Sequence, residues 1–213
     1  MGREFLNIFE KWAENYDSTV EGHDQEYQEV FRNYEEILQA VANRSSGNVI
    51  EFGVGTGNLT KKLLENNLTV TGIEPSNSMR KLAAGKLGEL ATLSDGDFLA
   101  FPAPKEQVDT IVSTYAFHHL TDKEKELAIR NYSNLLQTDG KIVFADTMFE
   151  TNEAFQETIE YAKQHKFFNL AEDLQREYYT TIPVLKNLFE QNGFEATFER
   201  FNHFVWIVEA TKQ

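Results

Sequence analysis

The chain has 213 residues, 41% of them hydrophobic and 25% charged, so it can bury a sizeable core and is not a disordered polypeptide. Its net charge of −14 repels polyanions, which argues against nucleic acid as a partner. Because the sequence contains no cysteine, disulfides, thiolate metal sites and cysteine nucleophiles are excluded.

Two amphipathic helices are predicted at the start of the chain, within residues 1–44. Apolar side chains recur at helical spacing over residues 4–16 and again over 27–41. Both stretches precede the first predicted strand, so the sheet can form without them. We therefore expect lid helices, with residues 1–20 mobile over the bound acceptor. The alternative is a first helix that stays packed on the sheet.

From residue 48 onward, short β-rich runs alternate with helical ones. The predicted strands are 49–52, 68–73, 90–93, 108–113 and 141–145, and the predicted helices between them are 58–66, 76–87 and 121–137. Strands that alternate with helices favour parallel βαβ units with right-handed crossovers. The pattern predicts an α/β fold, a Rossmann-like, doubly wound and mostly parallel sheet.

The last third of the chain departs from this alternation. Residues 147–180 form a long insertion that is helical in pattern and rich in aromatic side chains. A helix over 184–191 and two closely spaced strands, 194–201 and 203–210, follow it. These strands are expected to pair as a C-terminal antiparallel β-hairpin. Without any repeat or interdomain linker, we expect a single domain over 1–213.

A glycine loop follows the first predicted strand directly. It carries Gly53, Gly55 and Gly57, and the next helix is expected to begin at Asn58. Glycines at this place allow a tight turn and the close approach of a ligand to the backbone. The dinucleotide fingerprint would need glycine in place of Asn58, which disfavours a nicotinamide-dependent oxidoreductase.

Acidic side chains follow the next two strands. Glu74 ends the second strand, where a carboxylate can accept hydrogen bonds from both hydroxyls of a ribose. Asp97 and Phe98 lie in the turn after the third strand, an acid and a ring that could face the amine and the ring of adenine. Successive βα loops converge at one edge of a parallel sheet, so one nucleoside site is predicted there.

These motifs resemble those of class I S-adenosylmethionine-dependent methyltransferases. The segment EFGVGTG at 51–57 looks like the first motif of that family, and GIEPSNSM at 72–79 resembles its ribose-binding segment. GDF at 96–98 is similar to the adenine-binding turn, and residues 109–120 to the fourth strand and its loop. WAENYD at 12–17 resembles the lid of small-molecule members. Within the family, the chain is most similar to YrrT-type methyltransferases of Bacillus-like bacteria.

The resemblance implies a cofactor, S-adenosylmethionine, and a residue set that holds it. The glycines of the loop would line its methionine portion, Glu51 would orient the methionine ammonium, and Glu74 would bind the ribose. Asp97 would bind the adenine, which would lie between Met79 and Phe98. The cofactor-binding residues expected from the family are Glu51, Gly53, Gly55, Gly57, Glu74, Met79, Asp97 and Phe98.

The catalytic residues are not determined by the sequence. Candidate bases near the expected pocket are His118, His119 and Tyr16, followed by Tyr115 and Asp146. Each has a structural alternative, since paired histidines before a leucine also occur where a helix begins. Tyr178 and Tyr179 in the insertion are expected either to line the acceptor pocket or to pack a connecting helix. No metal site is expected.

The function favoured by the sequence is methyl transfer from S-adenosylmethionine to a small molecule. The alternative is a non-catalytic S-adenosylmethionine sensor or partner protein. The N-terminus lacks a targeting pattern, and no run approaches the ~20 apolar residues that span a bilayer. We therefore expect a cytoplasmic protein with no membrane partner. The acceptor, the methylated atom and the oligomeric state are left open.

Overall fold

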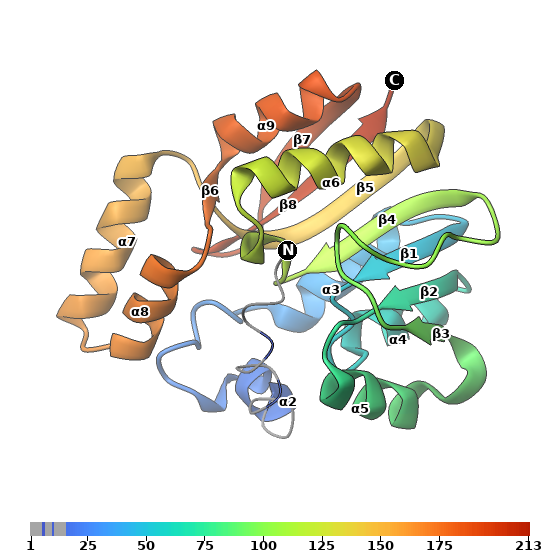
Figure 1. Cartoon of the computed structure of the whole chain (residues 1–213). Coiled ribbons are helices and arrows are strands. Elements are labelled where there is room, and N and C mark those ends of the chain that lie inside the picture. The colour runs from blue at the N-terminus through green and yellow to red at the C-terminus, as the bar shows by residue number, and fades with distance from the viewer. Residues whose placement is uncertain (1–5, 7–9, 11–15) are drawn as a thin grey trace.

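A central β-sheet with helices on both faces organises the chain (Figure 1). The computed structural model describes residues 6, 10 and 16–213. In that part of the chain the strands are β1 (Asn48–Phe52), β2 (Thr69–Ile73), β3 (Thr92–Ser94), β4 (Val108–Thr114), β5 (Leu136–Phe149), β6 (Thr180–Thr181), β7 (Phe194–Arg200) and β8 (Val205–Lys212).

The strand order is β3-β2-β1-β4-β5-β8-β7, with β6 paired to β5 outside this path. Neighbours from β3 to β5 are parallel, whereas β8 is antiparallel to both β5 and β7. The predicted Rossmann-like sheet and its C-terminal antiparallel hairpin are therefore confirmed.

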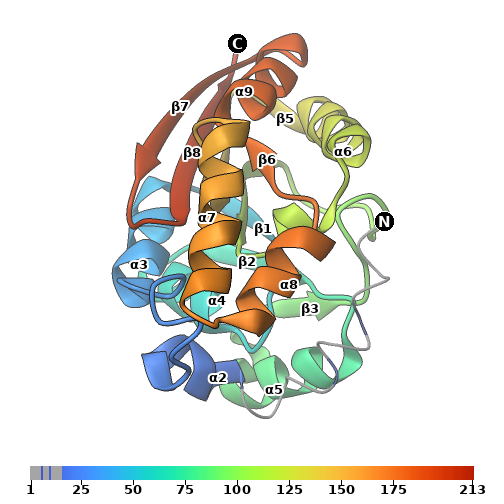
Figure 2. The same cartoon turned by 90° about the vertical axis from the view of Figure 1, so that its left-hand side faces the viewer.

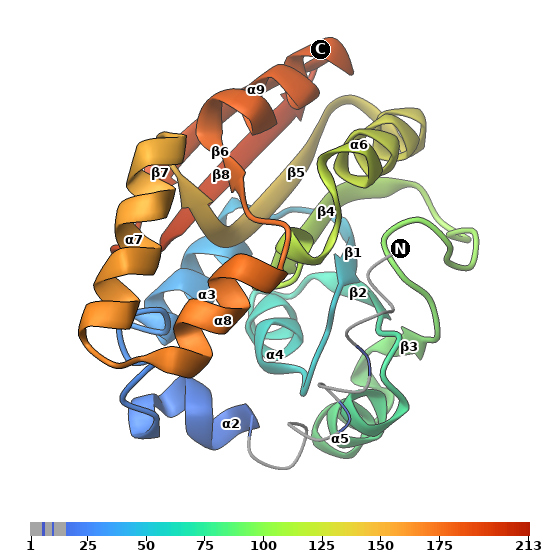
Figure 3. The same cartoon turned by 60° about the vertical axis from the view of Figure 1, so that its left-hand side comes forward.

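The helices that connect the strands cover both faces of the sheet. They are α2 (Tyr16–Ser18), α3 (Tyr34–Arg44), α4 (Asn58–Glu65), α5 (Asn77–Leu87), α6 (Asp122–Leu135), α7 (Asn152–Gln164), α8 (Phe168–Arg176) and α9 (Ile182–Gln191). Short helical turns are η2 (Thr19–His23), η3 (Gly88–Leu90) and η4 (Phe117–His119). Helices α6 and α9 lie over one face, and α3 and α4 lie over the other (Figures 1 and 3). Helices α7 and α8 stand side by side beyond the end of β5 (Figure 2).

Alternating strand residues supply the two halves of the core. Val112 of β4 packs with α3 and α4, whereas Ile111 packs with α6 and α9. The same alternation places Val143 and Phe144 of β5 on opposite faces. These strands bury apolar residues on both faces, and those residues are what the sequence pattern located.

The second predicted N-terminal helix is partly wrong. A helix was expected over 27–41, but α3 begins only at Tyr34, and residues 25–33 form turns. Asn33 has a left-handed φ of 62°, which interrupts a helix at that point. Tyr27 and Phe31 are nevertheless buried, so their apolar spacing reflects core contacts of an irregular segment. Most of the first predicted helix, over 4–16, lies outside the described residues.

Further differences concern the centre and the end of the chain. Helix α6 ends at Leu135 where 137 was predicted, and β5 begins at Leu136 and continues to Phe149, well beyond the predicted 141–145. The insertion is helical as expected, but it also supplies β6, which pairs with Met148 and Phe149 of β5.

None of the described helices is both long and apolar enough to span a membrane.

Candidate functional site

A cavity lies at the carboxyl edge of the parallel strands. Its walls come from the segments that follow β1, β2, β3 and β4, with one contribution from α2. The lining residues are Tyr16, Gly53, Gly55, Glu74, Pro75, Met79, Asp97, Phe98, Thr114, Tyr115, Ala116 and His119. This position is where open α/β sheets bind ligands.

The glycine loop forms one wall of the cavity. Gly53 has a φ of 69°, and a Cβ built on it would lie 2.8 Å from the Cβ of Ala116. Gly55 has a φ of 56° and no described atom within 4 Å of such a Cβ. A side chain at 55 would therefore extend into space that the loop leaves open. Gly57 lies off the wall and packs against Leu87 and Ala83 of α5.

Glu74 joins the glycine loop to the turn after β2. Its carboxylate accepts hydrogen bonds from the backbone N–H of Gly55 at 2.8 Å and of Ser76 at 2.7 Å. Each oxygen thus has one backbone donor, and a carboxylate oxygen can accept a second bond. Burial raises the pKa of Glu74, against the effect of these two donors. The group is fixed in place with capacity to bind hydroxyls of a ligand.

The turn after β3 contributes an acid and a ring to the opposite wall. Asp97 Oδ1 accepts hydrogen bonds from the backbone N–H of Leu99 and Ala100, both at 2.9 Å, which fixes the turn. Phe98 stacks on Phe52 with ring centroids 5.3 Å apart. Met79, in the first turn of α5, is 2% exposed and also lines the cavity. Two apolar side chains and a carboxylate therefore border this end of the cavity.

Glu51 lies outside the cavity wall, among the core residues of β1. Its carboxylate accepts a hydrogen bond from the Thr60 hydroxyl of α4 at 2.6 Å. Burial, opposed by this hydrogen bond, raises the pKa of Glu51 to about 8. The structure thus brings Gly53, Gly55, Glu74, Met79, Asp97 and Phe98 to one cavity, and leaves Glu51 and Gly57 behind the loop.

The other end of the cavity is bordered by Tyr16, Tyr115 and His119. Tyr115 follows β4 with a φ of 53°, an uncommon conformation for a bulky side chain. Its hydroxyl oxygen is buried and has no hydrogen-bond partner among the described residues. Burial raises the pKa of Tyr16 and of Tyr115, so both phenols are neutral donors at physiological pH. Tyr115 thus combines a left-handed backbone with a buried hydroxyl that no described residue engages.

Asp17, the last residue of the lid-like segment 12–17, fastens residues 16–18 to the glycine loop. Asp17 Oδ1 accepts hydrogen bonds from the Thr56 hydroxyl at 2.6 Å and from the Asn58 amide at 3.1 Å. Its other oxygen pairs with Lys86 of α5 at 2.5 Å. These contacts hold Tyr16 in the cavity wall, which also includes Gly53 and Gly55 of the glycine loop.

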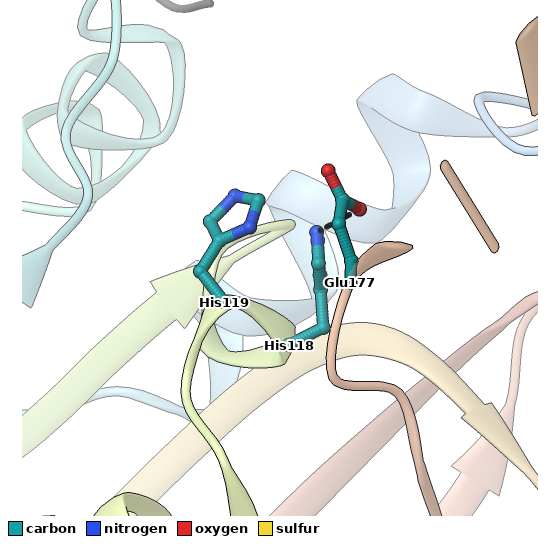
Figure 4. A group of neighbouring side chains, drawn as sticks. All are labelled: His118, His119 and Glu177. Carbon is teal, nitrogen blue, oxygen red and sulfur yellow. Dashed lines mark ion pairs between the residues drawn. The ribbon is translucent and has the colours of Figure 1, made fainter. Parts of the chain in front are cut away.

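Behind the cavity, His118 lies between two carboxylates. Its Nδ1 is 2.6 Å from Asp146 Oδ1, and its Nε2 is 3.3 Å from Glu177 Oε2, as Figure 4 shows for the second pair. Burial lowers the pKa of His118, but these carboxylates outweigh it and raise that pKa to about 10. Burial and the neighbouring His118 charge lower the pKa of His119 to about 3.

The insertion is attached to this cluster, although neither residue of the tyrosine pair lines the cavity. The Tyr179 ring stacks on His118 at 4.8 Å, and its hydroxyl donates to Glu177 at 2.8 Å. Lys125, 1% exposed, donates to the carbonyl oxygens of Leu120 and Tyr178. Glu177 and Lys125 have no recognisable spacing to His118 in the sequence, so only the tertiary fold reveals them.

Comparison with known proteins gives consistent results. A family model described as a methyltransferase domain matches residues 49–140. A protein of Anoxybacillus flavithermus is 63% identical over 213 residues and a protein of Geobacillus thermodenitrificans 60%; each match covers all of this chain and 99% or more of the relative. Both are described as uncharacterized methyltransferases.

Two solved structures share the fold at low identity. A SAM-dependent methyltransferase of Thermotoga maritima has a TM-score of 0.69 at 18% identity, over 98% of this chain and 99% of that one. Magnesium protoporphyrin IX methyltransferase of Synechocystis, with bound SAH, has a TM-score of 0.68 at 15% identity, over 97% and 99%.

Proposed function

The chain belongs to the methyltransferase family of its Anoxybacillus and Geobacillus relatives, and from this premise we propose that it transfers the methyl group of S-adenosylmethionine to a small molecule. The observation that carries the proposal is the cavity, because six of the eight residues expected to hold the cofactor line it together. They come from three successive βα loops. Convergence of this kind is what a nucleoside cofactor requires.

The residues of the cavity fit the parts of the cofactor. Glu74 would accept hydrogen bonds from the ribose hydroxyls, while Met79, Asp97 and Phe98 would surround the adenine. The methionine portion would lie along Gly53 and Gly55, where the absence of side chains leaves room for it. When bound, S-adenosylmethionine supplies an activated methyl group on a cationic sulfur.

The charge of the walls suits such a cofactor. Among the described lining residues, the formally charged side chains are Glu74 and Asp97, and no lysine or arginine is present. A carboxylate-lined, partly buried cavity favours a cationic ligand over an anionic one. The net charge of −14 acts in the same direction over longer distances.

The acceptor would bind between Tyr16, Tyr115 and His119, beyond the end of the cofactor site. Bound S-adenosylmethionine would supply the methyl group to a nucleophilic atom of the acceptor, and its sulfur would keep the electron pair of the broken carbon–sulfur bond. The buried Tyr115 hydroxyl can orient the acceptor by a hydrogen bond. Alignment of this kind is worth an effective molarity of ~10⁵–10⁸ M, so positioning supplies most of the rate.

A proton must leave only when the acceptor atom carries one. The imidazole of His119 borders this end of the cavity, but its pKa of about 3 makes it a weak base, so such a proton would leave with the methylated product and pass to solvent. Asp17, which holds Tyr16 on the glycine loop, would keep water out of the closed site.

Two measurements test the proposal. Calorimetry with S-adenosylhomocysteine and, separately, with NAD should show binding of the first alone. A mass-spectrometric screen of a small-metabolite extract, with protein and S-adenosylmethionine, should then show one compound that gains a methyl group. Binding without any methylated product would favour the sensor alternative, and binding of NAD alone would refute the proposal.

A further inference from the structure

His118, His119 and Glu177 form a cluster that methyl transfer alone does not account for. Each offers one ligand atom, and these atoms lie within 4.8 Å of one another (Figure 4). The two histidines end η4, just after β4, whereas Glu177 follows α8 in the insertion. All three side chains are largely buried, with His118 and Glu177 about a tenth exposed.

We infer that these three side chains form a binding site for one divalent transition-metal ion of the zinc class. Two imidazole nitrogens and one carboxylate oxygen are the donor set of open, catalytic zinc sites, in which a fourth position remains for water or substrate. The cavity wall includes His119, so the ion would border the acceptor end of the cavity.

Asp146 supplies the outer support that such a site needs. Its Oδ1 is 2.6 Å from His118 Nδ1, and its Oδ2 accepts the backbone N–H of His118 at 2.9 Å. A carboxylate bound to Nδ1–H leaves the lone pair on Nε2, the nitrogen that faces Glu177. Metal-bound histidines commonly have this kind of carboxylate partner.

The distance between the first two ligand atoms fits a shared ion. His118 Nε2 and Glu177 Oε2 are 3.3 Å apart. Ligand atoms at ~2.0–2.2 Å from a tetrahedral zinc ion are separated by roughly 3.3–3.6 Å. A strong hydrogen bond between these charged groups would be shorter, at about 2.7–2.9 Å.

The cluster lies among other charged groups. Asp146 and Glu177 are carboxylates that face the His118 imidazole, and Arg176 Nη2 lies 3.8 Å from Glu177 Oε1. Lys125, the nearby ammonium, is engaged by the Leu120 and Tyr178 carbonyls and pairs with Asp122. A divalent ion would add positive charge beside these two carboxylates.

The consequence for the reaction rests on the proposed function, whereas metal binding itself does not. An ion held here would fasten the insertion to the loop after β4. Its open position would bind a donor atom of the acceptor, provided that this atom reaches the His119 wall.

The test uses the full chain after removal of metals with a chelator. Titration with Co²⁺ at pH 8, followed by its visible absorption, and calorimetry with Zn²⁺ should each show one ion per chain. Glu177→Gln and His119→Gln should each weaken binding by at least tenfold, and Asp146→Asn by about 10- to 100-fold. The matched control is His165→Gln, which removes an exposed imidazole at the end of α7 and should leave the affinity unchanged.

Absence of Co²⁺ and Zn²⁺ binding by the folded wild-type chain would overturn the inference. So would equal affinity in wild type and Glu177→Gln, or loss of binding in His165→Gln alone. S-adenosylhomocysteine calorimetry on the same metal-free sample separates the two proposals, because the cofactor site lies at the other end of the cavity. Cofactor binding without metal binding would refute the metal site and leave the proposed function standing.

Discussion

Replacement of Glu51 by glutamine should stabilise the fold in a pH-dependent way. The carboxyl group is buried, and its folded-state pKa is about 8 against an ordinary value of 4.5. An acid with a raised folded-state pKa favours the folded state while it is protonated. That advantage is complete below the unfolded-state pKa, and it is lost as pH rises from 4.5 through 8.

The size of the effect follows from the two pKa values. A difference of about 3.5 corresponds to roughly 5 kcal/mol above pH 8, as an upper bound, because buried sites relax when they ionise. Glutamine has nearly the same shape, carries no charge and can still accept the Thr60 hydrogen bond. The variant should therefore match wild type near pH 4.5 and exceed it increasingly toward pH 9. Even 2 kcal/mol would raise Tm by about 4–8 °C in a chain of this length.

The assay is thermal unfolding followed by circular dichroism at pH 5 and pH 9, without cofactor, because bound ligand adds its own stabilisation. Glu89→Gln, an exposed position in η3, is the control and should follow wild type at both pH values. If Glu51 also orients the cofactor ammonium, the stabilised variant should bind S-adenosylhomocysteine more weakly at pH 9. A gain in Tm that is equal at the two pH values would refute the reasoning.

Three further predictions concern the cavity and its cover. Gly55→Val should abolish S-adenosylhomocysteine binding in calorimetry, whereas Gly88→Val, at a similar φ away from the cavity, should bind normally; retained binding at 55 would make the loop a simple turn. Hydrogen exchange within residues 1–20 should slow on addition of S-adenosylhomocysteine more than in the C-terminal hairpin; equal strong protection would favour a permanently packed helix. Asp17→Asn should remove the pairing with Lys86 and speed exchange in the same segment at low salt, an effect absent if Asp17 is dispensable.

Most strands of the sheet could be located from the sequence because they bury apolar residues on both faces. Val108, Ile111 and Val112 are buried apolar residues of β4, and glycines mark the turn after β1. The turns at 25–33 were missed because apolar residues are buried there without forming a helix. Tyr27 and Phe31 have helical spacing, yet they are buried from an irregular segment that ends at Asn33. Apolar spacing reports burial, and it reports a helix only where the backbone permits one.

The cofactor end of the site was predictable because loops after successive parallel strands must meet. That rule brings Gly55, Glu74 and Asp97 together without further knowledge of packing. The rule does not show which residues of these segments lie behind the cavity wall, as Glu51 does. The contact between His118 and Glu177 could not be predicted for a different reason. It depends on how the insertion folds back onto the loop after β4, which no sequence pattern shows.

The most direct test of the cofactor site is calorimetry with S-adenosylhomocysteine on wild type and Glu74→Ala. The carboxylate is fixed by two backbone donors beside the glycine loop, and hydrogen bonds to a charged acceptor are worth about 1.5–3 kcal/mol. We predict micromolar or tighter binding by wild type and a dissociation constant roughly 10- to 150-fold higher in the folded variant. Undetectable binding by wild type, or unchanged affinity in Glu74→Ala, would contradict the account.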